Sequence, residues 1–106
     1  MAENTLIVLS TFGSPEEARR VAFTLVEERL AACANLLPAV ESIYRWKGAV
    51  ETATETQVVF KTNIDRYYQL ETRLKQLHSY ETPEIVALRA HAGLLSYLRW
   101  VDDSCR

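Results

Sequence analysis

The sequence predicts an α+β fold in which two helices pack on an antiparallel sheet, and three observations lead to this prediction. The hydrophobic pattern changes in the order strand, helix, long hairpin, helix, strand and short helical tail. No linker or repeat divides the chain, so residues 1–106 are expected to form one domain. Two right-handed β-α-β crossovers turn this order into a four-stranded antiparallel sheet with both helices on one face, which is the ferredoxin-like sandwich.

The first strand and the first helix have clear signals. Residues 5–10 form a continuous apolar run, which is typical of a strand in the middle of a sheet. Ser14 follows as an N-cap, with Pro15 at the first helical position and Glu17 where it can close a capping box. Apolar and charged residues then occupy opposite helical faces, so we expect an amphipathic helix that ends near Leu30.

A long β-hairpin is predicted on either side of Lys47-Gly48. Residues 32–46 alternate with a period of two, and Pro38 indicates a bulge or an edge strand because proline cannot donate a ladder hydrogen bond. Residues 50–62 form the second arm. Arms of about 14 residues exceed the usual strand of about 5–6, so the tip is expected to project from the sheet. A projecting ribbon exposes edges that a second copy of the chain can cover, which predicts a homo-oligomer.

The second half of the chain predicts one more helix, one more strand and a tail. Asn63 can cap a helix over residues 64–78. After a polar loop, residues 84–90 have the pattern of a strand. The segment after Gly93 is amphipathic and is expected to form one or two helical turns.

Composition and charge argue against several classes of function. Twelve Lys and Arg against fourteen Asp and Glu give a net charge of −2, so no nucleic-acid partner is expected. The longest aliphatic run, residues 6–9, is far shorter than the ~20 residues that span a bilayer, and no basic signal-peptide start precedes it, so we expect no membrane association and a cytoplasmic location. Cys33 and Cys105 are separated in the way typical of reduced thiols. The core is large enough that no metal is required for folding.

Catalytic motifs are weak in this sequence. Ser10 or Ser79 could be combined with His78 and Asp65 into a Ser-His-Asp triad, but no nucleophile-elbow sequence accompanies them. The three glycines are too scattered to form a phosphate-binding loop. We therefore do not expect an enzyme.

His78 is the candidate metal ligand. A histidine between a helix end and a polar loop can be exposed and available to a metal, or it can cap the helix and complement the helix dipole. Cys33, Glu81 and Glu84 are the residues that could complete a metal site. Lys61 ends an apolar strand and is expected to need a carboxylate partner such as Glu84. Several aromatic residues could line a pocket or pack in a core or interface, namely Tyr44, Trp46, Tyr80, Tyr97 and Trp100.

Several spaced blocks of sequence carry a family resemblance. They are residues 31–38, 42–48, 61–62, 78–85, and Gly93 with residues 97–100. In this order they closely resemble the CutA (CutA1) divalent-cation tolerance proteins over nearly the whole chain. The resemblance implies a ferredoxin-like protomer similar to the nitrogen-regulatory PII proteins, assembled as a homotrimer through the long hairpins, cytoplasmic and often thermostable. It also implies a role in tolerance of copper and other divalent ions, without enzymatic activity.

The resemblance further implies a binding site in clefts between subunits. Matched position by position, the cleft residues are Cys33, Asn35, Trp46, Lys61, Tyr80, Glu84, Tyr97 and Trp100, with His78 as the metal ligand. Copper-ligating members use a Cys at the end of the first strand and two adjacent His, whereas this chain has Ser10, Leu77 and His78 there. From the family's link to divalent-ion tolerance, the expected ligand is a divalent metal ion, copper included. The alternative is a PII-like signalling or scaffold trimer that binds a small ligand or a protein partner, with metal binding incidental.

Overall fold

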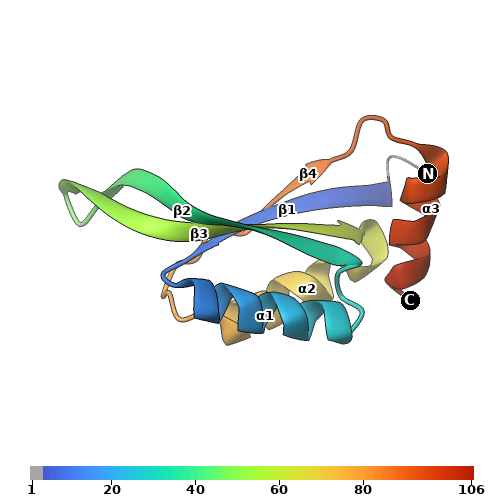
Figure 1. The fold of residues 1–106 in the computed structure, drawn as a ribbon, viewed down its shortest axis with the longest axis horizontal. Helices are drawn as coiled ribbons and strands as arrows, with labels where there is room; N and C mark the ends of the chain where they lie inside the picture. The colour runs from blue at the N-terminus through green and yellow to red at the C-terminus, as the bar shows by residue number, and fades with distance from the viewer. Residues whose placement is uncertain (1–3) are drawn as a thin grey trace.

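The computed structural model describes residues 4–106 and confirms the α+β sandwich (Figure 1). In chain order its elements are β1 (Thr5–Phe12), α1 (Pro15–Glu27), β2 (Cys33–Trp46), β3 (Ala49–Asn63), α2 (Ile64–Leu77), β4 (Val86–Arg89) and α3 (Leu95–Ser104). The strands pair in the order β2-β3-β1-β4, and each neighbouring pair is antiparallel. Helices α1 and α2 lie on one face of the sheet and α3 lies at its end (Figure 1).

The predicted caps begin both long helices. The Ser14 hydroxyl accepts a hydrogen bond from the Glu17 amide at 3.2 Å, and the Asn63 side chain accepts one from the Arg66 amide at 2.9 Å. Helix α1 ends at Glu27, before the predicted Leu30. The chain turns there because Arg29 adopts a positive φ of 63°, which a continuing right-handed helix does not allow.

The hairpin has the predicted length and irregularity. Its arms contain 14 and 15 residues, and Lys47 and Gly48 connect them with positive φ angles of 50° and 83°. The register shifts beside Pro38, where Ala39 has a φ of 59°, and β2 is an edge strand, so the predicted bulge and edge are both confirmed. The hairpin extends well beyond the helices (Figure 1), in a molecule of 44 × 25 × 22 Å.

The hydrophobic core fills the space between the sheet and the two helices. Fully buried side chains from the sheet, such as Val8 and Phe60, meet Leu25 of α1 and Leu70 and Leu74 of α2. Because side chains alternate along a strand, the residues between these core positions face the other way. The apolar side chains on the helix-covered face of the sheet are therefore buried by helices of the same chain.

The opposite face of the sheet, here called the open face, has no helix of residues 4–106 lying over it (Figure 1). Ile7 pairs with Leu88 and Leu9 pairs with Val86, so these four side chains share this face. Val86 and Leu88 are 47% and 50% exposed. Leu37 of β2 adds a further exposed apolar side chain in the same sheet.

The C-terminal part differs from expectation in length. Strand β4 covers only Val86–Arg89 because it pairs with β1 from Leu6 to Leu9 alone. Helix α3 has 10 residues, more than the predicted one or two turns, because Val101 and Cys105 pack on Ala32 in a small second core. Within residues 4–106, no helix has the length and apolar character needed to cross a membrane.

Candidate functional site

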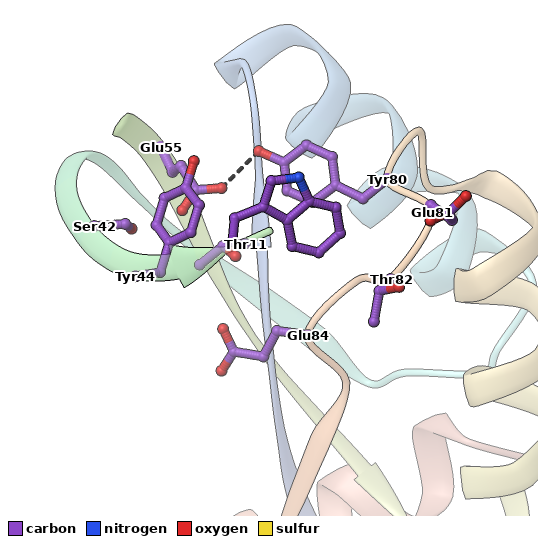
Figure 2. Close-up of a pocket in the computed structure, with 9 residues that line it drawn as sticks. Thr11, Ser42, Tyr44, Glu55, Tyr80, Glu81, Thr82 and Glu84 are labelled. Atoms are coloured by element: carbon purple, nitrogen blue, oxygen red, sulfur yellow. Dashed lines mark hydrogen bonds between the residues drawn. The ribbon is translucent and has the colours of Figure 1, made fainter. Parts of the chain in front are cut away.

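A pocket of about 500 Å³ lies at the base of the hairpin. It is called the hairpin-base pocket, and its walls are Thr11, Ser42, Tyr44, Trp46, Glu55, Tyr80, Glu81, Thr82 and Glu84. The end of β1, both arms of the hairpin and the loop between α2 and β4 contribute to it (Figure 2). The pocket therefore begins where the hairpin leaves the sheet and extends along the outer half of β2 to Trp46, next to the turn.

Aromatic rings and carboxylates share this pocket. The Tyr80 hydroxyl donates a hydrogen bond of 2.6 Å to the Glu55 carboxylate, which is only 9% exposed (Figure 2). Burial, followed by the bond to Glu55, raises the pKa of Tyr80 above its ordinary value. Tyr80 thus remains a hydrogen-bond donor at neutral pH. Within residues 4–106, no Lys, Arg or His forms an ion pair with Glu55.

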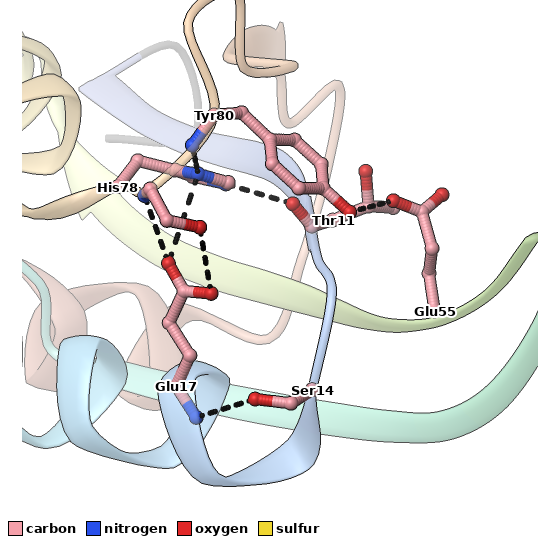
Figure 3. Close-up of polar contacts among 7 residues, drawn as sticks. Thr11, Ser14, Glu17, Glu55, His78 and Tyr80 are labelled. Carbon is pink, nitrogen blue, oxygen red and sulfur yellow. Dashed lines mark hydrogen bonds and ion pairs between the residues drawn. The ribbon is translucent and has the colours of Figure 1, made fainter.

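His78 is buried behind the pocket and both of its ring nitrogens are occupied (Figure 3). Its Nδ1 accepts a hydrogen bond from the Tyr80 amide at 3.1 Å, and its Nε2 lies 2.8 Å from the Thr11 carbonyl oxygen. The ring also stacks on Phe12 at 4.3 Å between centroids. Because Nδ1 accepts, this network assigns the proton to Nε2, which donates to Thr11. The expectation of an exposed imidazole is wrong, whereas His78 is the C-cap residue of α2 as the other interpretation predicted.

Glu17 ties the loop after α2 to the first turn of α1 (Figure 3). Its carboxylate accepts hydrogen bonds from the Ser79 amide at 2.9 Å and the Ser79 hydroxyl at 3.0 Å. Because Ser79 bonds to Glu17 and Asp65 begins the helix that His78 ends, these side chains do not form a triad. The other candidate nucleophile, Ser10, is buried and its hydroxyl has no hydrogen-bond partner within the described chain.

A second group, called the sheet-end cluster, lies where β2 begins and α3 returns to the sheet. It consists of Cys33, Asn35, Lys61, Tyr97 and Trp100. The Cys33 sulfur lies 3.6 Å from the Tyr97 hydroxyl, a hydrogen bond that raises the pKa of Tyr97. The Tyr97 and Trp100 rings lie 5.7 Å apart. Lys61 donates to the Asn35 side chain, so the expected pairing with Glu84 is wrong. Glu84 instead lines the hairpin-base pocket.

One protomer thus separates the predicted cleft residues into two groups. Trp46, Tyr80 and Glu84 line the hairpin-base pocket, and the other five make up the sheet-end cluster. Cys33 and Trp46 stand at opposite ends of β2, which at about 3.3 Å per residue places them about 40 Å apart along the strand. A single chain does not bring the two groups together.

Sequence reasoning missed Thr11, Ser42, Glu55 and Thr82, which also line the pocket. Glu55 could have been found from the turn, because a hairpin closed at Lys47-Gly48 places Glu55 opposite Val40. Val40 begins the row of alternate residues that leads to Tyr44 and Trp46. Among the residues that the structure describes, no three His, Cys, Asp or Glu side chains are grouped so that they could hold a metal ion.

Comparisons with known proteins agree with this fold. The family model for the CutA1 divalent ion tolerance protein matches residues 6–104. The divalent-cation tolerance protein CutA of Thermus thermophilus is 46% identical over 98 residues, covering 92% of this chain and 95% of that protein. The protein of the same name from Yersinia pestis is 40% identical over 101 residues, covering 95% of this chain and 85% of that protein.

A solved structure of a CutA protein has the same fold as this chain. The crystal structure of CutA from Xylella fastidiosa superimposes with a TM-score of 0.94 at 38% sequence identity, covering 97% of this chain and 99% of that chain. The match of the family model and the close relatives both extend over almost the whole sequence. This chain therefore belongs to the CutA1 family of divalent ion tolerance proteins.

Proposed function

We propose that the protein is a cytoplasmic homotrimer that binds divalent metal ions, copper among them, in clefts between its subunits and takes part in the response to these ions. Membership of a family named for divalent ion tolerance supports the ion class. The proposed location of the site is supported by one observation, which is that the hairpin-base pocket and the sheet-end cluster lie apart in one protomer. Residues of the two groups could meet in a cleft between two copies of the chain. The free thiols of Cys33 and Cys105 suit a reducing compartment.

The open face and the hairpin support assembly. Apolar side chains on the open face would lose contact with water against another copy, at about 25 cal/mol per Å² of apolar area buried. The outer edge of β2 is free in the protomer and can pair with another strand. Both features favour contact between copies of this chain.

The proposed metal ligands come from both groups. Glu81 and Glu84 of the hairpin-base pocket supply carboxylate oxygens, and Cys33 of a second copy supplies a thiolate. Such a mixed set suits copper or zinc better than a purely oxygen-seeking ion. His78 is not among the proposed ligands, because both of its ring nitrogens already have hydrogen-bond partners. Its proposed role is to hold Tyr80 in place.

The second candidate function is that of a PII-like signalling or scaffold trimer whose pocket takes a small ligand. The aromatic walls of the hairpin-base pocket favour it, because Tyr44, Trp46 and Tyr80 provide apolar surface that a metal ion does not use. Neither candidate requires catalysis.

The test combines sedimentation with calorimetric titration of the reduced protein by Zn(II) and Cu(II). We expect a trimer and stoichiometric binding that is lost in Glu84→Gln and Cys33→Ser but kept in Glu41→Gln, an exposed glutamate of β2 outside the pocket. A monomer at micromolar concentration would overturn the proposed trimer and the metal site between its subunits. A trimer that binds neither metal would overturn the first candidate function and leave only the second.

The variant His78→Ala separates ligation from positioning. If His78 only holds Tyr80, this variant lowers the stability of the loop and weakens metal binding less than Glu84→Gln does. Complete loss of binding in His78→Ala, with Glu84→Gln unaffected, would make His78 the ligand.

A further inference from the structure

We propose that the hairpin-base pocket binds an organic cation, a guanidinium or alkylammonium group, between the rings of Tyr44, Trp46 and Tyr80 with Glu55 as its counter-charge. This inference rests on the small-ligand candidate above and adds the class of ligand. It is carried by the composition of one pocket, in which three aromatic side chains and three carboxylates face the same space of about 500 Å³.

The first step is the charge of Glu55. Glu55 is nine-tenths buried, its carboxylate accepts a hydrogen bond from the Tyr80 hydroxyl, and within residues 4–106 no basic side chain forms an ion pair with it. A buried carboxylate without a cationic partner is costly in free energy. A cation that enters the pocket would remove this cost. Glu81 and Glu84 in the same wall add attraction for positive charge.

The second step is the aromatic wall. Tyr and Trp rings present a negative face, and a ring of such faces is a known means of holding ammonium and guanidinium groups. Trp46 already receives a cation in this protomer, since the Lys47 Nζ lies 5.8 Å from the centre of its ring. Lys47 is exposed at the hairpin tip and does not line the pocket, so this contact shows only that the Trp46 ring accepts a cation.

The third step distinguishes this ligand from a bare metal ion. Hard divalent ions require six or more oxygen ligands at short distance, and no three potential metal-binding side chains are grouped in the described part of one protomer. Aromatic carbons offer no such ligands. The pocket volume also falls within the range of about 300–1,000 Å³ that small-molecule sites occupy.

The fourth step is that the pocket is formed before the ligand arrives. Tyr80 is held at its hydroxyl by Glu55 and at its amide by His78. Its ring also lies so close to Gly13 that a Cβ there would come within 3.3 Å of the hydroxyl oxygen. Little ordering of Tyr80 is then needed on binding, which favours affinity.

The test is calorimetric titration with N-butylguanidinium and butylammonium, and with N-butylurea as the neutral control of nearly equal shape. We expect at least one cation to bind once per protomer, about ten-fold or more tighter than the urea. Glu55→Gln, which keeps the shape and the acceptor for Tyr80, and Trp46→Leu should each weaken binding about ten-fold. Glu51→Gln, a matched exposed glutamate of the same strand, should leave it unchanged.

Three results would overturn the inference. They are equal binding of the urea and the cations, absence of cation binding by protein with a native circular dichroism spectrum, and cation binding that Glu55→Gln and Trp46→Leu leave unchanged. Sedimentation and Zn(II) titration of the same preparation separate this inference from the proposed function. A metal-binding trimer without affinity for the cations refutes the inference alone, and a monomer that binds the cations refutes the proposed assembly alone.

Discussion

The two faces of the sheet are built from the same alternating strands but are completed differently. On the helix-covered face, Val8 and Phe60 are fully buried against α1 and α2 of their own chain. On the open face, Leu88 and Val86 remain about half exposed. The first face accounts for the stability of the protomer, and the second is the face that we propose another copy of the chain covers. Substitutions on the two faces should therefore affect different measurements.

The largest effect is expected on the covered face. Phe60→Ala removes a fully buried ring and leaves a cavity, so we expect the free energy of unfolding to fall by about 3–5 kcal/mol. Urea denaturation followed by circular dichroism measures this loss. A loss below about 1 kcal/mol would mean that the covered face is not the core of the molecule.

The second prediction concerns the open face. Leu88→Asp places a charge where another copy would cover it, so we expect subunit affinity to fall about ten-fold or more while the protomer stays folded. Phe23→Asp is the matched control, because Phe23 is 69% exposed on helix α1. Analytical ultracentrifugation should show dissociation in the first variant alone. Equal assembly of both variants would contradict the role of the open face.

Alkaline pH should destabilise the molecule through two tyrosines. Burial raises the pKa of Tyr67, which packs on the covered core, to about 12, and burial also raises the pKa of Tyr80. A raised pKa in the folded state means that stability is complete below the unfolded value of about 10 and is lost as pH rises toward the folded value. Unfolding midpoints should fall from about pH 10 upward, and Tyr67→Phe with Tyr80→Phe should flatten this dependence. If the pH dependence of the unfolding midpoint is the same in the double variant, groups other than these two tyrosines cause the loss of stability.

The smallest effect is a gain in stability. Ser10 is fully buried among the side chains of the covered face, and its hydroxyl has no partner within residues 4–106. Ser10→Ala removes this unsatisfied group, so we expect the free energy of unfolding to rise by up to about 1 kcal/mol. Thermal unfolding measures the shift. Thr11→Ala serves as a control on the neighbouring residue, which faces the other side of the strand.

Local signals predicted most of the fold. The caps Ser14 and Asn63, the interruption at Pro38 and the turn at Lys47-Gly48 each act within a few residues, and each is confirmed. The length of α3 was underestimated because its last turns depend on packing against Ala32, which is distant in the sequence. Contacts of this kind leave no periodic signal.

The site was only partly predictable for the same reason. Trp46, Tyr80 and Glu84 line one pocket within a single protomer, whereas the cleft between subunits that would join them to the other five residues stays a prediction. The depth of His78 was not foreseen, because its burial results from stacking on Phe12 and from a bond to a carbonyl 67 positions away in the chain. Lys61 donates a hydrogen bond to Asn35 on the adjacent strand β2 instead of pairing with Glu84 in the loop before β4.

The sequence by itself determined the order of the elements, the starts of the two long helices and the unusual length of the hairpin, because helix capping, side-chain alternation and turn formation are local interactions. Only the tertiary structure decided which side chains share a pocket, which histidine nitrogens are occupied and which face of the sheet lacks a cover. Those features depend on strand register and on packing between distant segments, which a one-dimensional pattern does not contain.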